Sequence, residues 1–289
     1  MQILLNGLIQ GALFALMGLA FSLVYSTTGV LHIALGAIYA LAPYILLTAL
    51  HIGFGWSVGM ILAVGVAVLV GMLCEEVLHW PFLRRNAPAE VHLIGSLGMF
   101  LVLVQGIAIL WGSDVQVLRN GVDAVYCFGD LRITRGQMFS GVGALIIIGA
   151  FFFWLQRTEL GLQFRAMADN PTLLSLLGRD VRKLRRFVFG MSAGLAALVA
   201  LGSSYDTGFD PHGGLEAVLV GVVATIVGGR GSLVGAVLVG VLLGLIRTEV
   251  VWFASARWEQ AATFTILALV LFFRPQGLFG RTLRLEEKS

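Results

Sequence analysis

Residues 3–25 read ILLNGLIQGALFALMGLAFSLVY and contain no charged side chain. A helix needs about 20 mostly apolar residues to cross the hydrocarbon core of a bilayer, so this stretch is long enough to span a membrane. It lacks the basic start and the short apolar segment of a cleaved secretory signal, so we expect it to persist as a span. The fold class then depends on how many such segments follow.

The composition extends this interpretation to the whole chain. Of the 289 residues, 58% are hydrophobic and only 12% are charged, whereas soluble domains average about 45–50% apolar and 25% charged residues. The 37 glycines fit the same class, because small residues let transmembrane helices approach closely. We therefore expect an all-α polytopic integral membrane protein, with one transmembrane domain over residues 1–289. We assign its excess of basic residues to cytoplasmic loops and expect no nucleic-acid partner.

The apolar segments predict about eight transmembrane helices, some of them broken or re-entrant. The piece at 215–229 is short enough to be a half-span, paired with the next one around a glycine-rich turn at 228–231. The segment 30–50 contains Gly36 and Pro43, so we expect it to be kinked or broken. Similar glycine-rich character at 3–50 and 187–250 suggests two related halves. The expected pieces are 3–25, 30–50, 56–78, 92–111, 138–155, 187–205, 215–229, 232–250 and 259–273, with a division near Trp252.

The basic residues predict the orientation. Of the 19 lysines and arginines, 14 fall in loops 79–91, 156–186 and 228–231 and the tail 274–289. The excess marks that side as cytoplasmic, with the C-terminus inside and the N-terminus outside. The outer loop 112–137 contains VDAVYCFGDLRIT (122–134), which predicts a small hairpin. Cys74 and Cys127 fall on opposite sides, so we expect neither a disulfide nor a metal site.

The cytoplasmic loop 156–186 contains the most charged stretch, RAMADNPTLLSLLGRDVRKLRR (165–186). Asn170 is a good N-cap, Pro171 suits the first helical position and Gly178 suits the left-handed residue after a helix, so we predict a helix over 171–177. Two turns are not stable alone. The helix either lies on the protein's own inner surface, with basic residues on membrane lipid, or docks in a groove of a cytoplasmic partner.

Polar residues inside the spans are candidates for a translocation path. For each of them an interhelical hydrogen bond is the more ordinary role. Glu75 and Glu76 lie at a span end near His79 and are expected on a solvated face. The candidates for the path are Asn6, Gln10, His32, Gly36, Tyr39 and Gln105, with Glu216 and the hydroxyls of Tyr25, Tyr44 and Ser96 as further polar groups.

Recognisable catalytic and cofactor motifs are missing from the sequence. GGRGSLVG (228–235) lacks the Lys-Ser/Thr of a phosphate loop, and no zinc-protease or serine-hydrolase motif occurs. We therefore expect no nucleotide site, cofactor, metal or enzymatic activity in this chain. The five histidines, His32, His51, His79, His92 and His212, are scattered along the sequence.

Four stretches, in order, resemble one family: 4–36, 160–184, 222–245 and 271–281. They are similar to the permease subunits of branched-chain amino acid ABC transporters, the LivH type. The resemblance implies two pseudo-repeated halves, a bacterial inner membrane and a second permease subunit, either LivM-like or an identical copy. It also implies two cytoplasmic ATPases that bind the ATP and a periplasmic substrate-binding protein. The loop matching 165–178 implies a coupling helix that docks on the ATPase, with Asp169, Asn170, Pro171, Leu173, Leu174, Leu176, Leu177, Gly178 and Arg179 as coupling residues.

The sequence departs from that family at the start of its second span. The family usually has Asn-Phe-Ala-His-Gly, where this chain has His32, Ile33, Ala34, Leu35 and Gly36, followed by the apolar Ala37. The expected cargo is a branched-chain or other hydrophobic amino acid. The departures keep urea, short amides or a pentose open as cargo. A stand-alone channel or secondary transporter stays open as another class.

Overall fold

The computed structural model describes residues 1–118, 125–128, 131–229 and 231–280. Within them, seven helical segments are long and apolar enough to cross a membrane, and two apolar helices, α2 and α10, are shorter. The helices are α1 (Gln2–Thr28), α2 (Leu35–His51), α3 (Trp56–Cys74), the π-helical turn η1 (Glu75–His79), α4 (Trp80–Arg84), α5 (Ala89–Trp111), α6 (Arg135–Arg157), α7 (Glu159–Asp169), α8 (Pro171–Leu176), α9 (Val181–Thr207), α10 (Gly214–Gly228), α11 (Leu233–Phe253), the 3-10 turn η2 (Ala256–Trp258) and α12 (Glu259–Phe273); the strands are β1 (Val125–Phe128) and β2 (Leu131–Thr134).

Each predicted apolar piece forms a helix, and the all-α polytopic class is confirmed. The predicted start of the second span at residue 30 is wrong, because α2 begins only at Leu35. The chain breaks before this helix: Gly29 takes a left-handed φ of 70° and its N–H closes the end of α1 on the Tyr25 carbonyl, at 2.9 Å. Pro43 lies inside α2, which continues past it.

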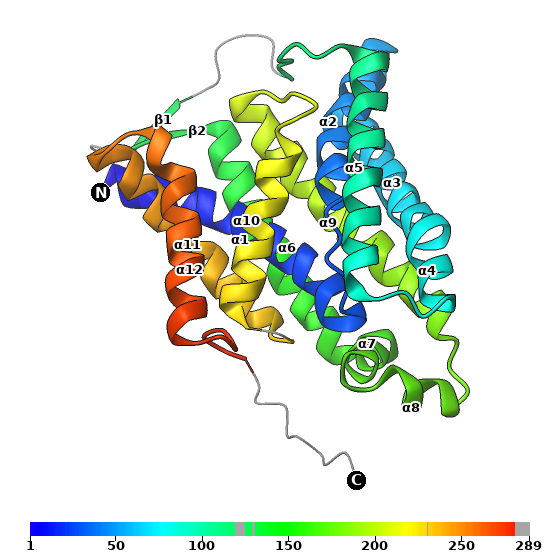
Figure 1. Ribbon diagram of the computed structural model, residues 1–289. Coiled ribbons are helices and arrows are strands. Elements are labelled where there is room, and N and C mark those ends of the chain that lie inside the picture. The colour runs from blue at the N-terminus through cyan, green and yellow to red at the C-terminus, as the bar shows by residue number, and fades with distance from the viewer. Residues whose placement is uncertain (119–124, 129–130, 230, 281–289) are drawn as a thin grey trace.

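The two predicted halves run in opposite directions. Helices α1 and α9 have 27 residues each, and each is followed by a break and a short apolar helix. In Figure 1, α1 starts near the β hairpin, whereas α9 starts near α8 at the other end of the molecule. Helix α1 packs along α11, and α9 packs along α3, so the first helix of each half lies on the third apolar helix of the other. Such inverted repeats are common in transporters.

The short helices α2 and α10 meet inside the molecule. After α9, the chain turns back so that the Phe209 ring packs on Tyr44, with 4.8 Å between centroids. Gly214, at the start of α10, then lies against Gly36, where a Cβ on Gly36 would be 2.5 Å from the Gly214 carbonyl oxygen. Positions 36 and 44 are about 12 Å apart along α2. Helix α10 therefore begins beside Gly36, about 12 Å along α2 from the point where the chain after α9 packs on Tyr44.

The predicted hairpin is confirmed. Strands β1 and β2 are antiparallel, with Val125 opposite Thr134, and the predicted Gly129-Asp130 turn lies outside the described residues. The Gln2 side chain donates to the Arg132 carbonyl at 2.7 Å and accepts from its N–H at 2.8 Å. The hairpin is thereby joined to the start of α1, at the end of the molecule opposite α8 (Figure 1).

Candidate functional site

Helix α8 has the capping that its sequence predicts. The Asn170 side chain accepts from the N–H groups of Thr172 (3.0 Å) and Leu173 (3.1 Å). At the other end Gly178 has a φ of 78°, and the Arg179 N–H donates to the Leu174 carbonyl at 3.3 Å, the bond pattern of a glycine C-cap. The helix ends at Leu176, one residue earlier than predicted. Both ends of this short helix are therefore fixed by the chain itself.

The leucines of α8 divide into two groups. Leu174 is buried and faces the rest of the protein. Leu173 is 57% exposed, and Leu176 and Leu177 are 78% and 79% exposed. The flanking Asp169 and Arg179 are also exposed. Three neighbouring exposed leucines at this capped loop helix form an apolar patch of the kind found where a protein contacts another protein or a membrane.

Helix α7 supports α8, and the sequence reasoning missed it. Phe164 and Met167 of α7 are buried, and the Phe164 ring packs between Trp154 of α6 (5.6 Å) and Phe187 of α9 (5.9 Å). The signal was present, because apolar residues at 160, 164 and 167 follow helical spacing. Through α7, the α8 patch rests on two spans.

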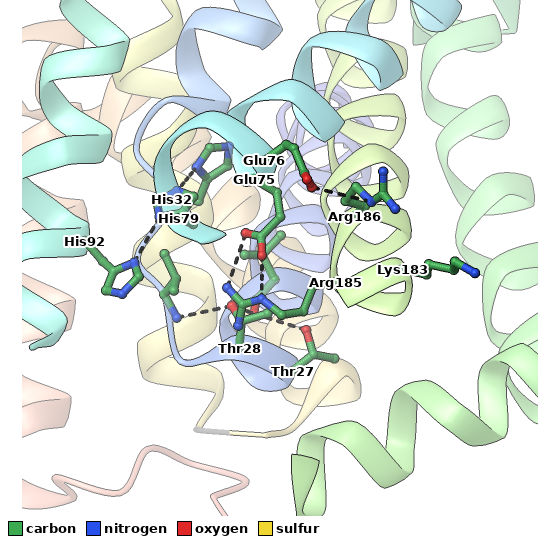
Figure 2. A network of polar contacts seen from close by, with 12 residues as sticks. Thr27, Thr28, His32, Glu75, Glu76, His79, His92, Lys183, Arg185 and Arg186 are labelled. Atoms are coloured by element: carbon green, nitrogen blue, oxygen red, sulfur yellow. Dashed lines mark hydrogen bonds and ion pairs between the residues drawn. The ribbon is translucent and has the colours of Figure 1, made fainter. Parts of the chain in front are cut away.

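A buried ion pair lies at the start of α9, shown in Figure 2. The Arg185 guanidinium binds the Glu75 carboxylate through Nε and through Nη2, the latter 3.2 Å from Oε2. The two side chains are only 6% and 1% exposed. Beside them, Glu76 pairs with Arg182 and with Arg186, whose Nε lies 3.5 Å from Oε2. This cluster, which we call the inner joint, fastens α9 to the π-helical turn after α3.

The expectation of a solvated face at Glu75 and Glu76 is wrong for Glu75, whereas the Glu76 side chain is 26% exposed. Glu75 and the neighbouring His79 are fully buried, because the first turns of α9 cover the π-helical turn η1. Such turns are rare and often occur at functional sites. Sequence spacing alone could not show that Arg185, 110 residues further on, covers Glu75.

Three histidines that looked scattered come together next to the inner joint (Figure 2). His32 Nδ1 lies 3.1 Å from His79 Nε2, and His79 Nδ1 lies 3.2 Å from His92 Nδ1. Each contact needs one ring N–H and one bare ring nitrogen, which neutral imidazoles provide. Among the described residues no group of His, Cys, Asp or Glu is arranged to hold a metal ion. The three histidines therefore connect the break before α2, which contains His32, through His79 to His92 of α5.

The structure does not gather the predicted path residues into one site. Gly36 lies where α2 meets α10, and Tyr39 lies three residues further along α2. Gln10 accepts from the Thr248 hydroxyl at 3.5 Å, and Asn6 accepts from Gln2 at 3.1 Å. Gln105 is exposed on α5, on the outside of the protein.

A second ion cluster lies at the hairpin side of the molecule. The buried Arg247 of α11 binds Glu216 at the start of α10 (2.5 Å) and Glu259 at the start of α12 (2.6 Å). In the sequence, Arg247 lies near the end of the expected apolar piece 232–250. Its two acidic partners lie in the first turns of their helices, where the helix dipole favours negative charge.

Comparison with known families agrees with this architecture. The model of the family described as "Branched-chain amino acid transport system / permease component" matches residues 3–273. The chain belongs to this family. Nearly all the described helices are included in the match, together with the loop that carries α7 and α8.

Relatives of this permease chain match it over almost their whole length. It is 26% identical to LivH, the high-affinity branched-chain amino acid transport system permease protein of Escherichia coli K12, over 97% of this chain and 96% of that protein. It is 28% identical to BraD, the corresponding permease protein of Pseudomonas aeruginosa, with the same coverage. In structure it resembles PsaBC from Streptococcus pneumoniae in complex with Fab, with a TM-score of 0.52, 13% identity and coverage of 96% of this chain and 93% of that one. That likeness concerns the fold alone.

Proposed function

We propose that this chain is the membrane subunit of a bacterial ABC importer for branched-chain or other hydrophobic amino acids. Two separate ATPases in the cytoplasm would bind the ATP, a second permease subunit would complete the membrane part, and a periplasmic binding protein would deliver the solute. Family membership and the names of LivH and BraD support the cargo class. The α8 side of the molecule then faces the cytoplasm, in agreement with its basic residues.

The observation that carries the proposal is the exposed apolar patch of α8, Leu173, Leu176 and Leu177. An amphipathic helix that places leucines outward suits a hydrophobic groove in a partner. Asp169 and Arg179, at the ends of the patch, can pair with charges at the rim of such a groove. Leu174 has a different role, because it is buried and holds α8 on its own subunit.

The inner joint connects the leucine patch of α8 mechanically to the membrane spans. Helix α8 leads through Gly178 and the N-cap Asp180 into α9, and four residues into α9 Arg185 is fastened to Glu75. A displacement of α8 would thus move α9 and the end of α3 together. Helix α2 lies against both, and it meets the short helix α10 at Gly36 and Gly214. Discontinuous helices of this kind commonly border the solute site of transporters, so we place the path near Gly36 and Tyr39.

The test is ATP-driven leucine uptake by the complete importer in proteoliposomes. The double variant Leu173→Asp with Leu176→Asp should lose uptake and ATPase binding, since two charges enter the apolar contact. The pair Leu173→Met with Leu176→Met should keep both, because methionine conserves volume and polarity. Uptake at the normal rate in the aspartate variant would disprove the coupling role of α8. Leucine flux through this chain without ATPases would instead favour a channel or secondary transporter.

A further inference from the structure

A cavity of about 900 Å³ lies between α3 and α6, over a floor made by α1, α2 and α9. Its wall on α6 follows one helical stripe from Gly136 to Ile147. That stripe is about 16 Å long, which is half of a bilayer core about 30 Å thick. The cavity is therefore a groove parallel to the spans, about one leaflet deep, on the hairpin side of the molecule.

Polarity changes along the groove. Its outer end carries Arg135, Trp56 and Tyr205, whereas its deeper part is lined mainly by aliphatic side chains such as Leu13, Leu198 and Ile147. Trp and Tyr prefer the level of the lipid headgroups. Arg135, the first residue of α6, is exposed and lies over the Phe139 ring, 5.7 Å from its centroid.

We propose that this groove holds an acyl chain of an anionic phospholipid from the hairpin-side leaflet, with the phosphate on Arg135. The apolar depth matches a chain in one leaflet, and the guanidinium supplies charge-assisted bonds to phosphate oxygens. An amino acid fits less well: cavities of about 300–1,000 Å³ hold much larger ligands, and the described lining residues include no acid for its ammonium group. Asp206, near Gly136, accepts instead from the Thr134 hydroxyl at 3.5 Å. The inference does not depend on the cargo of the transporter.

Two glycines of α6 provide a matched pair of variants. A Cβ at Gly143 or at Gly149 meets no atom within 4 Å, so a side chain can begin at either position without a clash. Gly143 lines the groove, whereas Gly149 is exposed on another face of the helix. Gly143→Phe therefore fills the groove, and Gly149→Phe adds the same ring outside it.

The experiment uses the full chain in nanodiscs that contain phosphatidylglycerol with a photoreactive acyl chain. After illumination, mass spectrometry compares labelling of the groove floor at residues 198–205 with labelling of the exposed face of α5. We expect the floor-to-α5 ratio to fall about tenfold in Gly143→Phe, since the ring excludes the chain, and to stay unchanged in Gly149→Phe. Arg135→Gln should remove the preference for phosphatidylglycerol over phosphatidylcholine.

Three outcomes would overturn the proposal. In the first, the floor is labelled equally in both phenylalanine variants. In the second, free leucine in the buffer displaces the label, which would make the groove part of the solute path. In the third, labelling of the floor is lost completely when a second permease subunit is reconstituted in the same nanodisc, which would make the groove a subunit interface.

Discussion

The two halves of the molecule make the same helix contact twice, but different side chains stabilise it. Helix α1 packs along α11, and α9 packs along α3. The fifth residue of α1 is Asn6, which accepts from Gln2 of the same helix. The fifth residue of α9 is Arg185, which forms a buried ion pair with Glu75 across the two halves.

The comparison shows that the buried ion pair between the two halves lies at the end of the molecule where α8 leads into α9. The ion cluster on the hairpin side, around Arg247, joins α10, α11 and α12 within one half. The inner joint joins the two halves to each other. A buried pair costs desolvation and often adds little net stability, but removing one partner is expensive. We infer that the inner joint keeps α9 and α3 in register when α8 is displaced.

The largest effect is expected from breaking the inner joint. Arg185→Met leaves the Glu75 carboxylate buried without its counter-charge, which should destabilise the protein by about 3–5 kcal/mol. Chemical unfolding in detergent micelles, followed by tryptophan fluorescence, measures the change. The double variant Glu75→Gln with Arg185→Met should recover part of the loss, because no buried charge remains.

Lys183 provides the control for that measurement. It pairs with Asp180, the N-cap of α9, at 3.5 Å, but its side chain is 75% exposed. An exposed pair contributes about 0–1 kcal/mol, so Lys183→Met should have little effect. Equal losses in Arg185→Met and Lys183→Met would show that the inner joint does not contribute to stability.

The second effect concerns the meeting of the two short helices. Gly36→Leu places a side chain against the Gly214 carbonyl, and forcing α2 and α10 apart should cost about 1–3 kcal/mol. In Gly65→Leu on α3, the new Cβ meets no atom within 4 Å, so this variant should unfold like the parent. Thermal unfolding of the three proteins in the same detergent tests the difference. If Gly36→Leu is as stable as Gly65→Leu, the close crossing of α2 and α10 is wrong.

The sequence predicted what depends on local chemistry. Apolar length gave the spans, and the caps Asn170 and Gly178 gave α8 to within one residue. It did not predict what depends on distant pairing. Glu75, Glu76 and His79 resemble a solvated helix end until Arg182, Arg185 and Arg186 are placed on them, and no local pattern records that contact.

The third effect is a loss of capping at α8. Asn170→Ala removes the acceptor for two N–H groups and should cost about 1 kcal/mol locally. Hydrogen exchange of residues 172–177 should become about fivefold faster, while exchange in the spans stays the same. Ser175→Ala, which removes only a hydroxyl bond to the Thr172 carbonyl, is the control. Exchange that does not change in Asn170→Ala would mean that a partner or a lipid, and not the cap, orders α8.

The smallest effect should come from Asp180, the N-cap of α9, and it depends on pH. The bond from the Lys183 N–H lowers the pKa of this carboxyl below its ordinary value of 3.8. A carboxyl whose pKa is lower in the folded state contributes stability that is complete above 3.8 and is lost as the pH falls through the folded pKa. Asp180→Asn keeps an acceptor for the Lys183 N–H but cannot titrate.

The first turn of α9 should therefore become less protected from hydrogen exchange in the parent when the pH is lowered from 5 to about 2.5, after correction for intrinsic rates. In Asp180→Asn the corrected protection should not change over this range. Asp169→Asn, at the exposed end of α7, controls for the general loss of negative charge in the loop. The same pH dependence in the parent and in Asp180→Asn would mean that another group titrates. The connection from α8 to the inner joint would then not depend on the charge of this cap.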